Sequence, residues 1–138
     1  MVDCILCKVL SGEFDGSFVY RGETCSALLD ISPMSKGHTL VVPNLHVARV
    51  SDLDPKLGEE MFSVATKISK AMYRWDPKMT AANLFLNDGS DAGQEIAHLH
   101  IHIVPRYPSD GIRFTHRAGE TTERGELDLI AQQIANQL

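Results

Sequence analysis

The 138-residue chain has few cysteines, a deficit of basic residues and no long apolar run, and each scarcity excludes a class of protein. Three cysteines cannot form a closed set of disulfides. Thirteen Lys and Arg against 18 Asp and Glu give a net charge of −5, which argues against an extended basic surface for duplex DNA or an anionic bilayer. No segment approaches the roughly 18 apolar residues of a membrane-spanning helix. We therefore expect neither a nucleic-acid partner nor a membrane partner.

The first ten residues, MVDCILCKVL, lack the basic start, apolar stretch and cleavage site of a secretory leader. The composition, 43% hydrophobic and 22% charged, is that of a globular protein, and no repeat or Pro/Gly/Ser-rich linker divides the chain. Single domains commonly span about 100 to 200 residues. We expect one cytoplasmic domain that covers residues 1–138.

Hydrophobic patterning predicts an α+β fold. The clearest helix runs from Pro55 to Trp75, with Asp54 as N-cap and an apolar stripe, Trp75 included, that should face the core. A short helix capped by Asp3 should end at Gly12, and a final helix should gather Leu127, Ile130, Ile134 and Leu138. Five strands are predicted, at 17–20, 24–31, 38–42, 81–86 and 96–105. The sum is an antiparallel sheet of about five strands with helices packed on it.

Histidine is unusually abundant, with six in the chain and three of them in His98-Leu99-His100-Ile101-His102. Successive side chains of a strand point to opposite faces, so Leu99 and Ile101 would enter the core and three imidazoles would lie on the other face, about 6.6 Å apart. Two functions fit this row. It is either a metal site, since neutral imidazole is a common ligand, or a catalytic face on which one imidazole is the nucleophile.

The loop before these histidines, NDGSDAGQE from Asn87 to Glu95, favours the catalytic alternative. It has glycines at two points where backbone N–H groups could approach a phosphate closely, and side-chain amides at Asn87 and Gln94. A glycine loop alone is most often a turn. One that leads into three alternating histidines is a more specific signal for a phosphate-bearing ligand.

The segment Asn87–Arg106, NDGSDAGQEIAHLHIHIVPR, resembles the signature of the histidine triad (HIT) family, His-φ-His-φ-His-φ-φ with φ apolar. The resemblance extends through LDISP at 29–33 and GHTLVVP at 37–43 to CILCK at 4–8. It implies a HIT-like fold with a long central helix. It also implies a nucleotide-binding hydrolase or transferase that attacks the α-phosphorus of a nucleoside phosphoryl compound, commonly as a homodimer.

The resemblance further implies a role for each matching residue. His100 would be the nucleophile and form a nucleotidyl-histidine that water hydrolyses, which a neutral imidazole can do without a separate base. His102 and His38 would contact the phosphate oxygens, and Asp30 would hold the ribose hydroxyls. The loop would add Asn87, Gly93, Gln94 and Glu95, and the base would lie against Ile5, Leu6, Val9, Leu28 and Ile31.

Cys4-Ile5-Leu6-Cys7 is a C-x-x-C motif, for which zinc is more plausible than a disulfide in a reducing compartment. Some members of the family complete such a site with two histidines, which here are His46 and His98. The resemblance thus implies a closed, structural Cys₂His₂ zinc site that pins the N-terminal helix to the catalytic strand. Without zinc, the cysteines would be small buried residues and His98 would relay protons or pack.

Glu95 departs from the family pattern, in which many members carry Ser or Thr. A carboxylate repels phosphate oxygens, so Glu95 either turns outward or favours a leaving group that bears an amine. We therefore predict a hydrolase of purine nucleoside phosphoramidates or related nucleotide conjugates. A dinucleoside polyphosphate hydrolase and a non-catalytic nucleotide-binding or sensing module are the alternatives. A metal-dependent His-x-His enzyme would need a Glu ligand shortly after His102, and no Glu lies within the ten residues that follow it, which argues against this class of enzyme.

Overall fold

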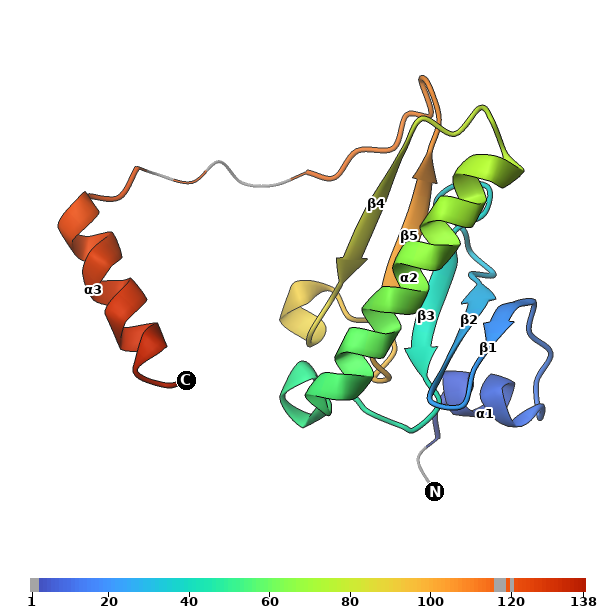
Figure 1. Ribbon diagram of the computed structural model, residues 1–138, viewed down its shortest axis with the longest axis horizontal. Coiled ribbons are helices and arrows are strands. Elements are labelled where there is room, and N and C mark those ends of the chain that lie inside the picture. The colour runs from blue at the N-terminus through green and yellow to red at the C-terminus, as the bar shows by residue number, and fades with distance from the viewer. Residues whose placement is uncertain (1–2, 116–118, 120) are drawn as a thin grey trace.

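The computed structural model describes residues 3–115, 119 and 121–138 (Figure 1). Within them, five strands form one antiparallel sheet of order β1-β2-β3-β5-β4. The strands are β1 (Phe18–Arg21), β2 (Cys25–Leu29), β3 (Thr39–Pro43), β4 (Ala81–Leu86) and β5 (Ile101–Arg106). The helices are α1 (Ile5–Ser11), α2 (Pro55–Trp75) and α3 (Arg124–Ala135), with short 3-10 turns η1 (Val50–Asp52) and η2 (Ser90–Ala92). The predicted α+β fold is confirmed.

Helix α2 lies across one face of the sheet (Figure 1). Its N-cap is Asp54, whose side chain accepts the Lys56 N–H at 2.8 Å, and Pro55 follows at the first helical position. Its buried residues recur at helical spacing: Met61, Val64, Ala65, Ile68 and Met72. Trp75 does not join them, because its ring packs against Gly37 and under Lys36 and is 53% exposed. The prediction that Trp75 belongs to the core is therefore wrong.

Alternation along the strands divides the core into two clusters. Under α2 the sheet contributes Cys25, Ala27, Val41 and Ile103. The opposite face holds Cys4, Leu6, Val9, Leu28, Leu40 and Val42. This second cluster packs α1 against β2 and β3, next to the strand that carries the last triad histidine. None of the helices among the described residues is long and apolar enough to cross a membrane.

Helix α1 begins after Cys4 instead of Asp3, whose carboxylate forms an ion pair with Lys8 at 2.7 Å. The helix ends at Gly12 as predicted. Gly12 has a φ of 84°, and its N–H donates to the Val9 carbonyl at 3.2 Å. A seven-residue helix is too short to be stable alone, so α1 depends on its buried contacts.

The first three strands differ from the predicted ones by one or two residues at their ends, and two predicted elements differ by more. β5 begins at Ile101 rather than at residue 96, because the preceding segment bonds to a loop: the Leu99 N–H donates to the Val47 carbonyl at 2.7 Å. The prediction that the three imidazoles lie in a single row on one strand is therefore wrong. Helix α3 forms, but all its residues are exposed and it lies apart from the sheet in Figure 1, so its predicted packing on the sheet is also wrong.

Candidate active site

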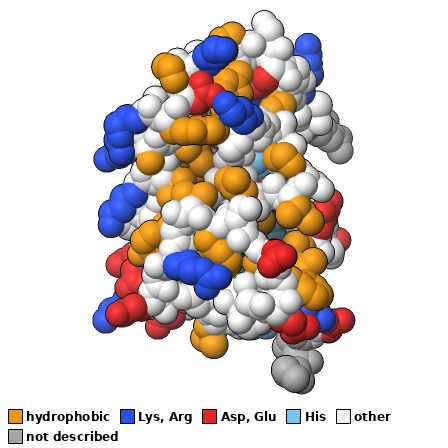
Figure 2. Space-filling model, turned by 90° about the vertical axis from the view of Figure 1, so that its right-hand side faces the viewer, with side chains coloured by type: hydrophobic (Ala, Val, Ile, Leu, Met, Phe, Trp, Pro, Cys, Tyr) orange, Lys and Arg blue, Asp and Glu red, His pale blue; other side chains and the backbone are white. Residues whose placement is uncertain are grey.

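A cavity of about 440 Å³ lies over the face of the sheet opposite α2. Four of its lining residues are cross-strand neighbours: Leu28 on β2, Leu40 on β3, His102 on β5 and Phe85 on β4. Neighbours in register present their side chains to the same face, so the strand pairing itself brings His102 into the cavity. Figure 2 shows histidine atoms recessed among hydrophobic side chains on one side of the molecule.

The structure brings the predicted nucleotide-binding residues together around this cavity, with one exception. The lining includes Ile5, Leu6, Val9, Leu28, Asp30, Ile31, Asn87, Gly93 and Glu95. The exception is Gln94, whose Oε1 accepts the Gly89 N–H at 2.7 Å and whose Nε2 donates to the Ala48 carbonyl at 2.9 Å. Gln94 therefore stabilises the loop through these two hydrogen bonds. The prediction that its amide is available to a phosphate is wrong.

The loop between β4 and β5 owes its shape to two glycines. Gly89 has a φ of 97° and Gly93 a φ of 85°, values that a residue with a Cβ rarely adopts. Asn87 reaches across the loop and donates to the Gly93 carbonyl at 3.3 Å. Of the two glycines, Gly93 lines the cavity, whereas Gly89 lies against the side chain of Arg49.

Sequence reasoning missed Phe85 and Met34, which also line the cavity. The ring of Phe85 stacks on His102, with centroids 4.4 Å apart and planes 14° apart. The signal that could have found Phe85 is strand register, since antiparallel pairing of β4 with β5 places it opposite His102. Met34 lies in a loop, where no periodicity applies.

A chain of hydrogen bonds fixes the tautomers of two imidazoles, as assigned from their partners. The backbone N–H of Met34 can only donate, so Nδ1 of His38 accepts it at 3.1 Å and the His38 proton lies on Nε2. His38 Nε2 then donates to Nδ1 of His102 at 2.9 Å. Nδ1 of His102 being an acceptor, its proton must lie on Nε2. His38 is 2% exposed and also lines the cavity, and both of its ring nitrogens are engaged, one by Met34 and the other by His102.

Burial keeps both of these imidazoles neutral at pH 7. It lowers the pKa of His102 to about 4, with further lowering by the neighbouring His100 and His38. Burial also lowers the pKa of His38, against the opposing effect of the Asp30 carboxylate, which lies 3.8 Å from His38 Nδ1. A second Asp30 oxygen accepts the Ser32 N–H at 2.8 Å.

His100 has the opposite tautomer. Its Nδ1 lies 2.7 Å from the main-chain carbonyl of His98, which can only accept, so Nδ1 carries the proton. Nε2 of His100 therefore keeps its lone pair. The ring lines the cavity and its centroid lies 4.6 Å from that of His102. A neutral imidazole held in this way can act as a nucleophile.

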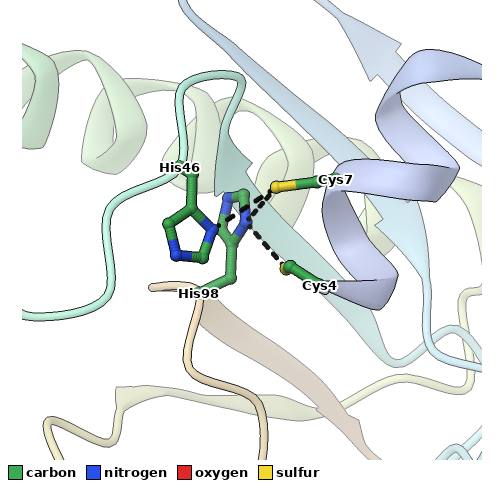
Figure 3. Close-up of side chains that lie close together, drawn as sticks. All are labelled: Cys4, Cys7, His46 and His98. Atoms are coloured by element: carbon green, nitrogen blue, oxygen red, sulfur yellow. Dashed lines mark hydrogen bonds between the residues drawn. The ribbon is translucent and has the colours of Figure 1, made fainter. Parts of the chain in front are cut away.

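The four predicted metal ligands also come together (Figure 3). Cys4 and Cys7 come from the start of α1, His46 from the loop after β3 and His98 from the segment before β5. Their ligand atoms all lie within 4.8 Å of one another. His98 Nδ1 is 3.4 Å from the sulfur of Cys4 and 3.5 Å from that of Cys7, and His46 Nδ1 is 3.4 Å from the Cys7 sulfur.

These residues fit a zinc ion. Tetrahedral bond lengths for thiolate and imidazole ligands put sulfur and nitrogen about 3.6 Å apart, close to the separations found here. The Nε2–H of His98 donates to the Pro43 carbonyl at 2.9 Å, which leaves Nδ1 as a lone pair towards the thiols. A metal-bound imidazole usually donates such a hydrogen bond from the ring nitrogen that does not bind the metal.

Comparison with known sequences identifies one protein family and several relatives of this chain. The HIT domain family model matches residues 11–109. "Protein hit" of Bacillus subtilis is 39% identical over 105 residues, 76% of this chain and 72% of that protein. "Adenylylsulfatase HINT3" of Arabidopsis thaliana is 37% identical over 78% of this chain and 54% of its own length. "Adenosine 5'-monophosphoramidase HNT1" of Saccharomyces cerevisiae is 31% identical over 75% of this chain and 62% of its own length.

Solved structures agree with the sequence comparison. A HIT family protein from Bacillus anthracis superposes with a TM-score of 0.92 at 36% identity, covering 99% of this chain and 97% of that one. A Zn-bound histidine triad family protein from Mycobacterium smegmatis has a TM-score of 0.77 at 32% identity and covers 97% of each chain. The extent of the family match, the cavity and the histidine geometry lead to one conclusion: this chain belongs to the HIT domain family.

Proposed function

We propose that this protein hydrolyses purine nucleoside phosphoramidates or related nucleotide conjugates at the α-phosphate. The observation that carries the proposal is the tautomer of His100, whose Nδ1–H is held by the His98 carbonyl at 2.7 Å and whose Nε2 has no hydrogen-bond partner among the described residues. The relatives named as an adenylylsulfatase and an adenosine 5'-monophosphoramidase support this class of substrate.

The reaction runs in two steps. Nε2 of His100 attacks the α-phosphorus, an N–P bond forms, and the bond to the leaving nitrogen breaks as that nitrogen takes up a proton from solvent. Water then attacks the same phosphorus, the N–P bond breaks with its electron pair returning to His100, and a nucleoside monophosphate leaves with a proton released to solvent. Each step passes through added charge on the phosphate oxygens, which a fixed donor stabilises.

The other cavity residues have distinct parts in this proposal. The Nε2–H of His102 donates to a phosphate oxygen, and His38 holds His102 in that tautomer. The Asp30 carboxylate accepts from the ribose hydroxyls, and the apolar wall that includes Leu6 and Leu28 covers the base. His98 contributes its main-chain carbonyl to His100.

Glu95 supports an amine-bearing leaving group. Its carboxylate is exposed and lines the cavity, and within the described residues it has no hydrogen-bond or ion-pair partner. Near a protein surface, opposite charges about 4 Å apart attract by roughly 1 to 4 kcal/mol, and like charges repel equally. The carboxylate of Glu95 would therefore attract a departing amine that has taken up a proton, and would repel the remaining phosphates of a dinucleoside polyphosphate.

The leaving group is tested by comparing Glu95→Gln with Glu59→Gln, a matched control on the exposed side of α2. We expect Glu95→Gln to lower the ratio of kcat/KM for an adenosine phosphoramidate to kcat/KM for a dinucleoside polyphosphate, and Glu59→Gln to leave it unchanged. An unchanged ratio in both variants would sink the role of Glu95. Wild-type preference for the dinucleotide would favour that alternative hydrolase.

The nucleophile is tested by trapping. Rapid acid-free quenching after mixing with an activated nucleoside phosphate should leave a phosphoramidate adduct, located by mass spectrometry on His100. His100→Ala should lose turnover yet bind a nucleoside monophosphate. An adduct on another residue, or near-normal turnover by His100→Ala, contradicts the mechanism. Binding without any turnover by the wild type would identify a nucleotide-sensing module instead.

We also propose a structural zinc ion bound by Cys4, Cys7, His46 and His98. The ligand separations and the Zn-bound relative from M. smegmatis support it. When bound, zinc supplies a fixed charge that holds two thiolates and two imidazoles in a tetrahedron. Because His98 also presents its carbonyl to His100, this cluster would connect the position of α1 to that of the nucleophile.

A cytoplasmic homodimer completes the proposal. Thiol ligands need a reducing compartment, which supports the cytoplasm. Strand β4 lies at the edge of the sheet, and the apolar residues of α3 are exposed in the single chain, which supports burial against a second copy. Light scattering at micromolar concentration should give the mass of two chains, and the mass of one chain would contradict it.

A further inference from the structure

Two phenylalanines form a stack that ends on a triad histidine. Phe85 lies flat against His102, at 4.4 Å between centroids and 14° between planes. Phe114 meets Phe85 edge to face, at 5.2 Å and 72°. Both geometries are favourable for aromatic pairs. Phe114 is 29 positions from Phe85, so something must return the chain to β4 after β5 ends at Arg106.

An ion pair makes this return. Nε and Nη2 of Arg106 donate to the two carboxylate oxygens of Asp110 at 2.8 and 2.9 Å. The same guanidinium donates from Nη1 to the Asn83 side chain on β4 and from Nη2 to the Ile112 carbonyl, each at 2.7 Å. Asp110 also accepts the N–H groups of Tyr107 and Ile112 at 3.0 Å.

The turn is more elaborate than a surface connection requires. Its side chains are only 23% exposed for Arg106 and 12% for Asp110. Ser109 has a φ of 60°, a backbone conformation that costs energy for a residue with a Cβ. Bidentate Arg–carboxylate pairs fix geometry as well as supply energy. The ion pair therefore fixes the path of the chain that leads to Phe114.

We propose that Phe85, Phe114, Arg106 and Asp110 form an aromatic brace that positions the ring of His102 for phosphate binding. Phe114, Arg106 and Asp110 are positioning residues, because they act on the substrate through His102, whereas Phe85 also lines the cavity itself. The inference rests on the proposed function for its catalytic consequence, but the orientation of the ring is a property of the substrate-free protein.

The brace answers a geometric need. The hydrogen bond from His38 holds His102 at Nδ1 alone, and one bond allows the ring to tilt about that nitrogen. The flat face of Phe85 opposes this tilt, and Phe114 supports Phe85 through their edge-to-face contact. Nε2–H is then directed along one line, as a fixed donor to a phosphate oxygen must be.

Phe114 gives the cleanest test, because it is not among the residues that line the cavity and is 43% exposed, so its loss leaves the nucleotide contacts intact. The variants are Phe114→Leu and Phe114→Tyr, with Phe62→Leu on α2 as a matched control at an exposed phenylalanine. We expect Phe114→Leu to lower kcat roughly two- to tenfold, the factor that one aromatic pair supplies, with nucleoside monophosphate affinity unchanged. Phe114→Tyr keeps the ring and should match the wild type.

A spectroscopic measurement separates positioning from catalysis. In substrate-free protein, the ring protons of His102, assigned by their loss in His102→Gln, should move in Phe114→Leu and not in Phe62→Leu, because the stacking on Phe85 changes. Unmoved resonances together with wild-type kcat in Phe114→Leu would overturn the brace. If the wild type cleaves no nucleotide conjugate, the proposed function fails, and the His102 resonances alone still decide whether the brace exists.

Discussion

Replacing His38 tests the hydrogen-bond chain that sets the tautomer of His102. In the wild type, His38 Nε2–H donates to His102 Nδ1 at 2.9 Å, and the His102 proton is thereby kept on Nε2. In His38→Leu no donor faces Nδ1. The His102 proton can then move to Nδ1, which would turn a lone pair towards the phosphate instead of a donor.

The size of the effect follows from the burial of the pair. His38 is 2% exposed, and its removal also leaves the Met34 N–H without its acceptor. An unpaired buried polar group costs about 1 to 3 kcal/mol. If the loss at His102 falls on the transition state, kcat/KM drops roughly five- to 150-fold.

His38→Gln is the matched variant. The amide nitrogen of glutamine reaches about as far from the backbone as imidazole Nε2 does and can donate to His102 in the same place. We expect His38→Gln to exceed His38→Leu by about tenfold in kcat/KM, the value of one hydrogen bond.

The assay measures kcat/KM on an adenosine phosphoramidate, with urea unfolding to correct for any loss of stability. Nitrogen NMR of the histidines reports the tautomer of His102 directly. Equal activity of His38→Gln and His38→Leu, or an Nε2–H tautomer of His102 in His38→Leu, would refute the reasoning.

Three further predictions concern stability and metal. Because burial lowers the pKa of His102 to about 4, the unfolded chain binds a proton between pH 4 and 6.5 that the folded chain does not, so stability should fall as the pH drops. The free energy of unfolding measured in urea should be about 2 kcal/mol lower at pH 5 than at pH 7 because of His102, and the difference between the two pH values should be clearly smaller in His102→Gln. Chelation of zinc should lower the melting temperature and the activity together, and Cys7→Ala should copy both effects; zinc-free protein with wild-type melting would exclude a structural ion. Asp54→Ala should cost about 1 kcal/mol in calorimetry through the lost cap on α2, and an unchanged melting temperature would contradict that role.

Much of the fold was accessible from the sequence because its signals are local. The bounds of α2 follow from Asp54, Pro55 and a 3.6-residue repeat, and β4 was predicted to the residue. Gly12 ends α1 through its own φ of 84°. Trp75 was misplaced because the same repeat continues to the last turn of α2, where the ring meets Gly37 rather than the sheet.

The sequence predicted which residues belong to the site better than it predicted how they are arranged. The spacing of the histidines and the resemblance that it carries named more than half of the residues that line the cavity, and all four candidate zinc ligands. They could not show that Gln94 would bond to Ala48, 46 positions away. They also could not show that β5 starts only at Ile101, so that His98 lies before the strand and not on it.

The sequence by itself determined which residues are available to form the site. Periodicity, caps and glycines act over a few positions, and they determine the helices, most of the strands and the glycine-bearing loop between β4 and β5. Tertiary structure decided what each side chain does. The proton position on His38 follows from the nearby Met34 N–H, but that on His102 depends on a contact between residues 64 positions apart. The proton positions on His100 and His98 depend on two main-chain carbonyls. An imidazole is a donor or an acceptor only in relation to its partner, and the folded chain chooses the partner.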